Sequence, residues 1–164
     1  MGDGIEKLLA DARARLAGAP RERLGMLRTP RRILGLGRAP RIEPVGAAWH
    51  LGVLLLTEDR LLATGEIVRA REEARRGFTA ESQRERAAVA AAAFRGGFAE
   101  GETVHLDWRE IDLDALAAGT ASGPVALVDG VPSVRWSAGG AFMPLVAYLR
   151  ERVDLLVSPP QGAT

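Results

Sequence analysis

Apolar residues are concentrated in the middle of the chain, in residues 49–71, WHLGVLLLTEDRLLATGEIVRAR. Two runs rich in strand-forming residues, 48–56 and 61–69, flank the polar tetrad at residues 57–60. We expect these runs to pair as a hairpin in which the numbers of facing residues sum to 117. Because both faces of the first run are apolar, it is predicted to be a central strand that is covered on both sides.

The predicted pairing sets Gly52 opposite Gly65 and leaves a gap in side-chain cover beside His50. A helix or a large neighbouring side chain fills such a gap more often than a ligand does. The same register sets Glu66 among apolar side chains, where a buried carboxylate needs an arginine partner. We interpret Glu66 as a rim residue paired with an arginine. If the protein has catalytic chemistry, His50 and Glu66 are the candidate residues.

Three main helices are predicted, and residues 111–118 are predicted to form a short helix or a turn. Apolar residues at three- and four-residue steps indicate an amphipathic helix over residues 5–17. A second helix over residues 82–94 has an alanine-rich face that suits close packing on a sheet, and Ser82 begins a capping box. A third helix opens at Pro144. Its expected apolar stripe consists of Val146, Leu149, Val153 and Leu156.

Further strands are predicted at the C-terminal side of the second helix. Residues 102–108 alternate between apolar and polar positions, as a half-buried strand does. Residues 125–128 and 131–136 flank Asp129-Gly130, a strong signal for a two-residue hairpin turn. Pro132 lacks an amide hydrogen, which favours an edge position for the second of these strands.

Together these elements predict an α+β fold with a single domain. We expect a mainly antiparallel sheet of about five or six strands, two main packing helices and an N-terminal helix. The domain is expected to span residues 1–158, with a helical and arginine-rich segment at 1–43 and a sheet and helix core at 44–157. The tail, residues 159–164, is expected to be disordered.

Charge is distributed unevenly along the chain. The net charge is +1 in total, but residues 1–43 carry +5 and residues 99–164 carry −5. Residues 23–42 hold six arginines and no acidic residue, a pattern that suits an anionic ligand, an acidic protein or nucleic acid. The same segment is also consistent with a solvated surface that docks on the acidic C-terminal half. The candidate anion-binding or partner-binding residues are Arg28, Arg31, Arg32, Arg38 and Arg41.

Two similar turns flank the second predicted helix, RRGF at residues 75–78 and RGGF at residues 95–98. We interpret them as helix ends that are anchored by phenylalanine. As an alternative, Arg75, Arg76 and Arg95 are candidates to hold an anion between them.

Several classes of chemistry lack their residues. The chain has no cysteine, which excludes disulfides, thiolate metal sites and a cysteine nucleophile. It has no nucleophile elbow, phosphate-binding loop or dinucleotide fingerprint. The two histidines, His50 and His105, could form a metal site with one carboxylate if their strands were neighbours, but their spacing in the sequence does not indicate one. We therefore expect no metal and no cofactor. The absence of a long apolar run predicts a cytoplasmic protein without a membrane segment.

Five segments resemble a family of small uncharacterised proteins from GC-rich bacteria: AWHLGVLLL, LLATGEIVRA, AAFRGGFAEGETV, GVPSVRWSAGG and PLVAYLRERVDLL. Some members of that family are labelled glutaminase. Established glutaminases are similar either to serine enzymes with a Ser-x-x-Lys pair or to cysteine-dependent amidotransferases, and this chain has neither set of residues. The resemblance therefore implies a coherent single-domain family and transfers no catalytic residue.

The sequence favours a non-enzymatic binding or structural module. Its expected contact surface is the arginine-rich segment, which would meet an acidic protein or an anionic ligand. The alternative is a small hydrolase, directed at an amide, that uses Glu66 or His50 with a water molecule. A third interpretation is weak nucleic-acid binding, although residues 23–42 contain no aromatic side chain to stack on a base.

Overall fold

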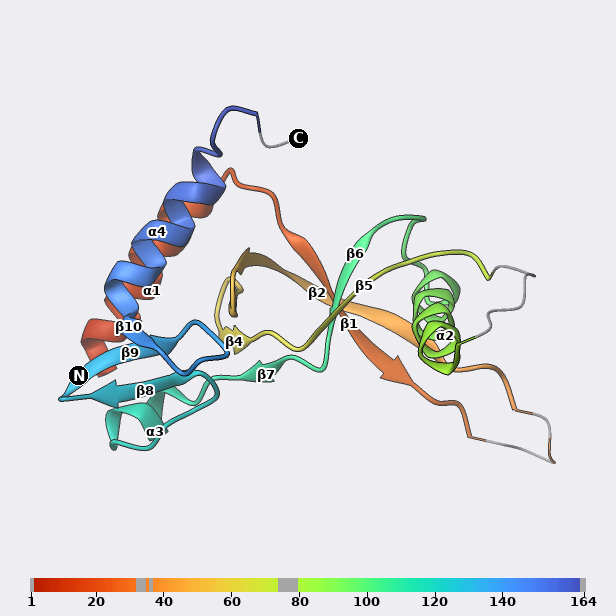
Figure 1. Cartoon of the computed structure of the whole chain (residues 1–164), viewed down its shortest axis with the longest axis horizontal. Coiled ribbons are helices and arrows are strands. Elements are labelled where there is room, and N and C mark those ends of the chain that lie inside the picture. Colours follow the sequence, from red (N-terminus) through yellow and green to blue (C-terminus); the bar gives the residue numbers. More distant parts are fainter. Residues whose placement is uncertain (1, 32–34, 36, 74–79, 163–164) are drawn as a thin grey trace. The chain divides into compact units, whose positions relative to one another are not determined.

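The computed structural model describes residues 2–31, 35, 37–73 and 80–162 (Figure 1). Within these residues the chain forms four helices and ten strands, which confirms the predicted α+β class. No described helix is long and apolar enough to cross a membrane. The residues cluster into two compact units: unit 1 is Met1–Arg21, Ala48–Thr64 and Arg109–Thr164, and unit 2 is Glu22–Ala47 and Gly65–Trp108. The prediction of a single domain stays a prediction.

Unit 1 contains two small sheets and three helices. One sheet has the strand order β2-β3-β4-β7 and the other the order β10-β9-β8. Its elements are α1 (Gly2–Leu16), residues 48–51 of β2 (Arg41–Leu51), β3 (Leu54–Leu56), β4 (Leu61–Ala63), β7 (Arg109–Glu110), α3 (Leu113–Ala117), β8 (Val125–Val128), β9 (Val131–Arg135), β10 (Phe142–Pro144) and α4 (Leu145–Val157).

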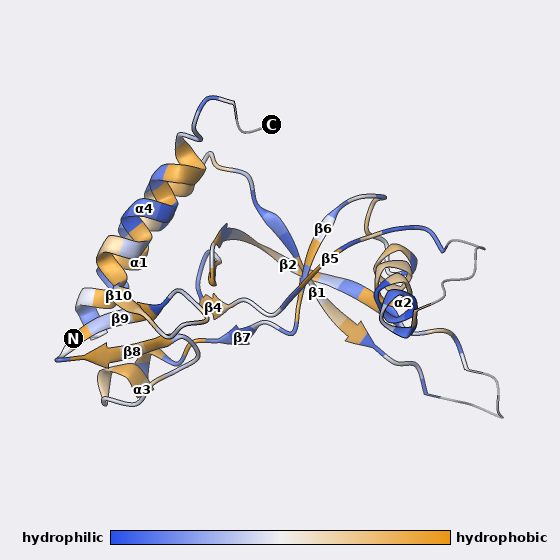
Figure 2. Ribbon diagram, in the orientation of Figure 1, coloured by the Kyte–Doolittle hydropathy of each residue, from blue (hydrophilic) through white to orange (hydrophobic). Residues whose placement is uncertain are grey.

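The helices α1 and α4 lie side by side in unit 1 (Figure 1). Helix α1 buries Ile5, Leu9, Ala12 and Leu16, as its period predicts. In Figure 2, α4 alternates between hydrophobic and hydrophilic positions along its length. Its predicted stripe is right at Leu149 and Val153 and wrong at Val146, which is 48% exposed. The buried face consists of Leu145, Tyr148, Leu149 and Val153, so Leu145 and Tyr148 take the place that the prediction gave to Val146.

The predicted central hairpin is right in one half and wrong in the other. Facing residues sum to 117 in the three pairs that join β3 and β4: Leu54 and Ala63, Leu55 and Leu62, Leu56 and Leu61. The register fails beyond these pairs because the chain reverses at Gly52, which has a φ of +69° at the first position of a two-residue turn. Strand β2 therefore pairs with β3, and Gly52 does not face Gly65.

The sheet of β8, β9 and β10 contains the predicted two-residue hairpin. Asp129 and Gly130 have φ values of 50° and 79°, the left-handed pair that a type I′ turn requires, and Val128 faces Val131. The prediction that Pro132 marks an edge strand is wrong, because β9 is the central strand. The proline is tolerated because the pairing of β9 with β10 ends at Ser133.

Unit 2 contains four paired strands and one long helix. Its elements are β1 (Glu22–Arg28), residues 41–47 of β2, β5 (Glu66–Arg69), α2 (Glu81–Arg95) and β6 (Thr103–Leu106). The strand order is β5-β6-β1-β2, and β1 and β6 run parallel, with Leu24 facing His105. The sequence predicts an irregular or short-strand segment over residues 23–42, and β1 agrees with the strand alternative, but nothing in the sequence predicted a parallel pair.

Helix α2 packs its alanine face against the sheet of unit 2. Ala92 and Ala93 are buried in one cluster with Ile42 of β2 and Val104 of β6, so the predicted close packing is confirmed. The predicted capping box is wrong: α2 begins one residue before Ser82, and its N-cap residue, Ala80, makes no side-chain capping bond. Beyond α4, residues 158–162 are exposed and form no helix or strand, and the rest of the predicted tail lies outside the described residues.

Candidate functional site

Unit 2 contains an open apolar pocket of about 520 Å³ between α2 and its sheet. Every residue that lines this pocket belongs to unit 2. Most of the lining is aliphatic, with one indole and three charged side chains. The lining residues are Gly25, Met26, Leu27, Pro40, Ile42, Glu66, Ala88, Val89, Ala92, Arg95, Leu106, Asp107 and Trp108.

Small residues on two elements leave room for the pocket. On β1, a Cβ at Gly25 would lie 2.5 Å from Ile42 Cγ2 and 2.8 Å from Val104 Cγ1, so β1 approaches its neighbours too closely for a side chain there. On α2, Ala88 and Ala92 lie one turn apart and present only methyl groups to the pocket. The pocket is thus bounded by a bare stretch of strand and a smooth helix face.

The indole of Trp108 forms part of the pocket wall. Its Nε1 donates a hydrogen bond to the carbonyl oxygen of Gly25 on β1 at 3.3 Å. The preceding residue, Asp107, has a φ of +53°, a left-handed conformation that is uncommon outside glycine. This conformation turns the chain at the end of β6, and the hydrogen bond fixes the indole against β1.

Three charged side chains, Glu66, Asp107 and Arg95, line the pocket, and they differ in how they are bonded. The Arg95 guanidinium donates to the carbonyl oxygen of Pro40 from Nε at 3.3 Å and from Nη2 at 2.9 Å. Its Nη1 lies 3.7 Å from a carboxylate oxygen of Glu73. Glu66 and Asp107 are exposed. The positive charge at the pocket is therefore compensated, whereas two carboxylates face solvent.

The structure assigns the two predicted catalytic residues to different units. His50 lies on β2 in unit 1, and its Nε2 is 3.0 Å from the carbonyl oxygen of Gly52. Glu66 lies on β5 in unit 2 at the rim of the pocket. Its predicted position among apolar side chains is wrong, because the predicted strand of residues 61–69 is divided into β4 and β5. The predicted rim position is right, but no ion pair with an arginine is found for Glu66 among the described residues.

The predicted gap beside Gly52 is filled. A Cβ at Gly52 would lie 2.3 Å from the hydroxyl oxygen of Tyr148, so α4 supplies the large side chain that the sequence analysis expected at this place. A Cβ at Gly65 would lie 2.3 Å from the carbonyl oxygen of Leu106. Each glycine permits close packing within its own unit, and neither opens a ligand site.

The candidate anion-binding arginines fall into three groups. Arg28 is paired with Glu43, at 3.5 Å between Nε and Oε2. Arg31 and Arg38 are exposed, and Arg41 is half-buried. Arg95 is bonded at the pocket, as described above. The remaining candidates, Arg32, Arg75 and Arg76, lie outside the described residues, so the anion site between the two flanking turns stays a prediction.

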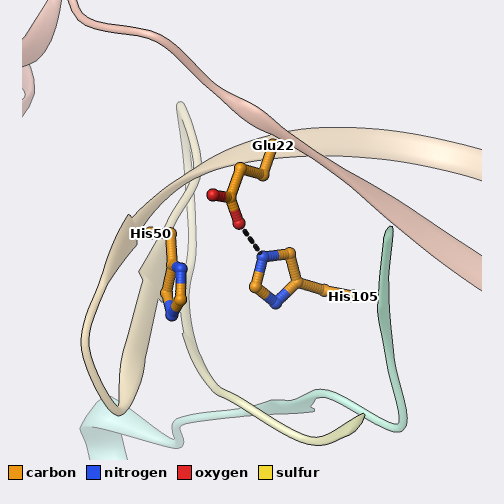
Figure 3. A group of neighbouring side chains, drawn as sticks. All are labelled: Glu22, His50 and His105. Atoms are coloured by element: carbon orange, nitrogen blue, oxygen red, sulfur yellow. Dashed lines mark hydrogen bonds and ion pairs between the residues drawn. The ribbon is translucent and has the colours of Figure 1, made fainter. Parts of the chain in front are cut away.

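A hydrogen-bonded pair of titratable side chains that the sequence did not predict lies in unit 2. Glu22 is the first residue of β1, and its carboxylate accepts a hydrogen bond from Nε2 of His105 on β6 (Figure 3). His105 is 0% exposed. The two residues are 83 positions apart, and only the parallel pairing of β1 with β6 brings them together. Because no solvent reaches the imidazole, we interpret the pair as part of the sheet's internal hydrogen bonding.

Comparisons with known proteins add no relative to this picture. No protein-family model matches the chain, and searches of curated proteins and of solved structures found no match. The family resemblance seen in the sequence therefore stays an expectation, and the function has to be argued from the residues of the pocket.

Proposed function

We propose that the protein is a non-enzymatic binding module that holds the apolar part of a small molecule in the pocket of unit 2. The observation that supports this proposal is the pocket itself, with its volume of about 520 Å³ and its largely aliphatic lining. Sites for small molecules typically have volumes of about 300–1,000 Å³, apolar walls and a few polar groups. The pocket has all three properties.

The exposed position of Ala88 supports a binding role. A larger apolar side chain at this position would cover apolar surface of the pocket. Covering that surface would stabilise the folded protein by about 25 cal/mol for each Å² removed from water. Because Ala88 is exposed, such a side chain would not disturb the buried cluster of unit 2. The two apolar residues of β1 at the pocket, Met26 and Leu27, are 38% and 59% exposed. Exposed apolar side chains beside a pocket are typical of a ligand contact surface.

The polar groups of the pocket favour binding over catalysis. Among the residues that the structure describes, the lining contains no hydroxyl, thiol, imidazole or lysine side chain, so these usual nucleophiles are absent from the described lining. Its two carboxylates, on Glu66 and Asp107, are exposed to water, whereas catalytic acids and bases usually lie in partly desolvated surroundings. The hydrolase alternative has no comparable support, because the pocket contains neither His50 nor any other histidine.

A fluorescence titration with the uncharged dye N-phenyl-1-naphthylamine tests this function. We expect saturable enhancement with the wild-type protein. Ala88→Trp fills the pocket from α2 and should weaken the affinity by at least about tenfold, or about 1.4 kcal/mol. Gln83→Trp adds the same side chain to an exposed position of α2 outside the pocket and should leave the affinity unchanged. Equal affinities in all three proteins would contradict the proposal.

As a second function, we propose that the arginine-rich segment binds polyanions or an acidic protein. In the described part of the chain, Arg23 and Arg28 are paired with Glu102 and Glu43. Arg31 and Arg38 are exposed, and no ion pair joins either of them to another described residue. Their charge is thus available for an external anion, and binding of that kind should weaken steeply with salt.

A further inference from the structure

The polar rim of the pocket of unit 2 carries two carboxylates, one on β5 and one on the residue that directly follows β6. Glu66 faces Leu106 in the antiparallel pair of β5 and β6, and Asp107 is the residue that follows Leu106. Facing residues in such a pair have Cα atoms about 4.5–5.5 Å apart. Glu66 and Asp107 both line the pocket and both are exposed. Both carboxylates therefore belong to the lining of one pocket and face solvent there.

The net charge of the rim is negative. Arg95 is the third charged residue of the lining, but its guanidinium is bonded to the Pro40 carbonyl and lies beside Glu73. A ligand anion would have to compete with these contacts, and it would also be repelled by Glu66 and Asp107. A ligand cation gains attraction from both carboxylates, and within the described part of the chain it would displace no ion pair of theirs. Charge complementarity thus favours a cation at the rim.

The apolar walls of the pocket complete this preference. Apolar walls beside two carboxylates are the groups that recognise an apolar amine.

We propose that the ligand of this pocket is a small amphipathic cation. Its aromatic or branched aliphatic body lies between α2 and β1, and its single ammonium group faces Glu66 and Asp107. This inference rests on the proposed binding function and extends it to a class of ligand. It excludes apolar carboxylates, such as fatty acids, as the preferred occupants.

A series of three ligands with one naphthalene body tests the charge preference: 1-naphthylmethylamine, 1-naphthalenemethanol and 1-naphthoic acid. Each is measured by displacement of N-phenyl-1-naphthylamine. The amine should bind more tightly than the alcohol by about two- to fivefold, the range for one exposed ion pair, and the acid should bind most weakly. Raising the salt concentration should reduce the difference between the amine and the alcohol.

Two isosteric substitutions test whether the carboxylates of the rim cause the preference for the amine over the alcohol. Glu66→Gln combined with Asp107→Asn removes both charges, and asparagine tolerates the left-handed φ of position 107. The double variant should bind the amine and the alcohol equally. Glu43→Gln, which removes a carboxylate of unit 2 outside the pocket, should keep the preference for the amine.

The outcomes separate this inference from the proposed function. If the dye does not bind in the pocket, the proposed function fails and the inference fails with it. If the dye and the alcohol bind but the amine has no advantage, the pocket is a binding site and the cation inference is wrong. Tighter binding of the acid than of the alcohol would also overturn the inference and would assign the dominant charge to Arg95.

Discussion

The side chain of Tyr148 occupies the space over Gly52. Its hydroxyl group donates a hydrogen bond to the Leu51 carbonyl and accepts one from the Val53 amide, each at 2.8 Å. One side chain of α4 thus bonds the residues on both sides of Gly52, at the turn that reverses β2 into β3. Glycine is required at position 52 for two reasons. Its φ is +69°, and a Cβ there would lie 2.3 Å from the hydroxyl oxygen of Tyr148.

Tyr148→Phe tests this relationship. The substitution keeps the ring and removes both hydrogen bonds, leaving the Val53 amide without its hydroxyl partner. We expect the free energy of unfolding to fall by about 1–3 kcal/mol, as measured by urea denaturation. In a double-mutant cycle with Gly52→Ala, the two effects should be less than additive, because removal of the hydroxyl relieves the closest contact of the new methyl group. An unchanged denaturation midpoint for Tyr148→Phe would contradict the account.

Gly96 is expected to be the most sensitive glycine of unit 2. It has an ordinary φ of −77°, but a Cβ would lie 1.5 Å from the carbonyl oxygen of Ile42. Gly96→Ala should therefore destabilise the protein by at least about 2 kcal/mol, since backbone atoms would have to move. Gly18→Ala is the matched control, because a Cβ there meets no atom within 4 Å. Similar melting temperatures for the two variants would rule out this close approach.

The pair of Glu22 and His105 should contribute to stability. Glu22→Ala removes the carboxylate that bonds a fully buried imidazole, and we expect a loss of about 1–3 kcal/mol in urea denaturation. Glu43→Ala removes a carboxylate from a largely exposed ion pair with Arg28, which should cost no more than about 1 kcal/mol. Equal losses for the two variants would show that the buried pair has no special weight.

The sequence predicts contacts between residues that are close together along the chain better than contacts between residues that are far apart. The buried face of α1 and the Asp129-Gly130 turn follow from residues within a few positions of one another, and both predictions are confirmed. The filling of the gap over Gly52 involves Tyr148, 96 residues away, so the sequence indicated only that something large would fill it. Local preference also favoured a continuous strand through Gly52, whereas the packing of α4 favours a turn.

The candidate site was less predictable than the fold. Its lining comes from β1, β2, β5, β6 and α2, and the parallel pairing of β1 with β6 has no local signal in the sequence. Glu66 was singled out because an acidic residue interrupts an apolar run, and it does lie at the pocket. Its partner at the rim, Asp107, was placed on a regular strand, because a left-handed φ at an aspartate cannot be read from alternation.

The arginine-rich segment should retain the protein on heparin. We expect the wild type to elute at higher salt than Arg31→Glu combined with Arg38→Glu, because counterion release makes such binding steeply salt-dependent. Arg109→Glu combined with Arg150→Glu is the control, since it changes the net charge equally at exposed positions of unit 1. Identical elution of both double variants would assign any retention to net charge alone and remove the segment as a binding surface.

The central claim, that the pocket of unit 2 binds the apolar part of a small molecule, is tested most directly by the indole N–H signals in a ¹H–¹⁵N correlation spectrum. The chain has three tryptophans, and of these only Trp108 lines the pocket. On titration with 1-naphthalenemethanol, the Trp108 signal should shift and saturate, while those of Trp49 and Trp136 stay in place. A shift confined to the exposed Trp136, or no shift of Trp108 at saturating ligand, would contradict the claim.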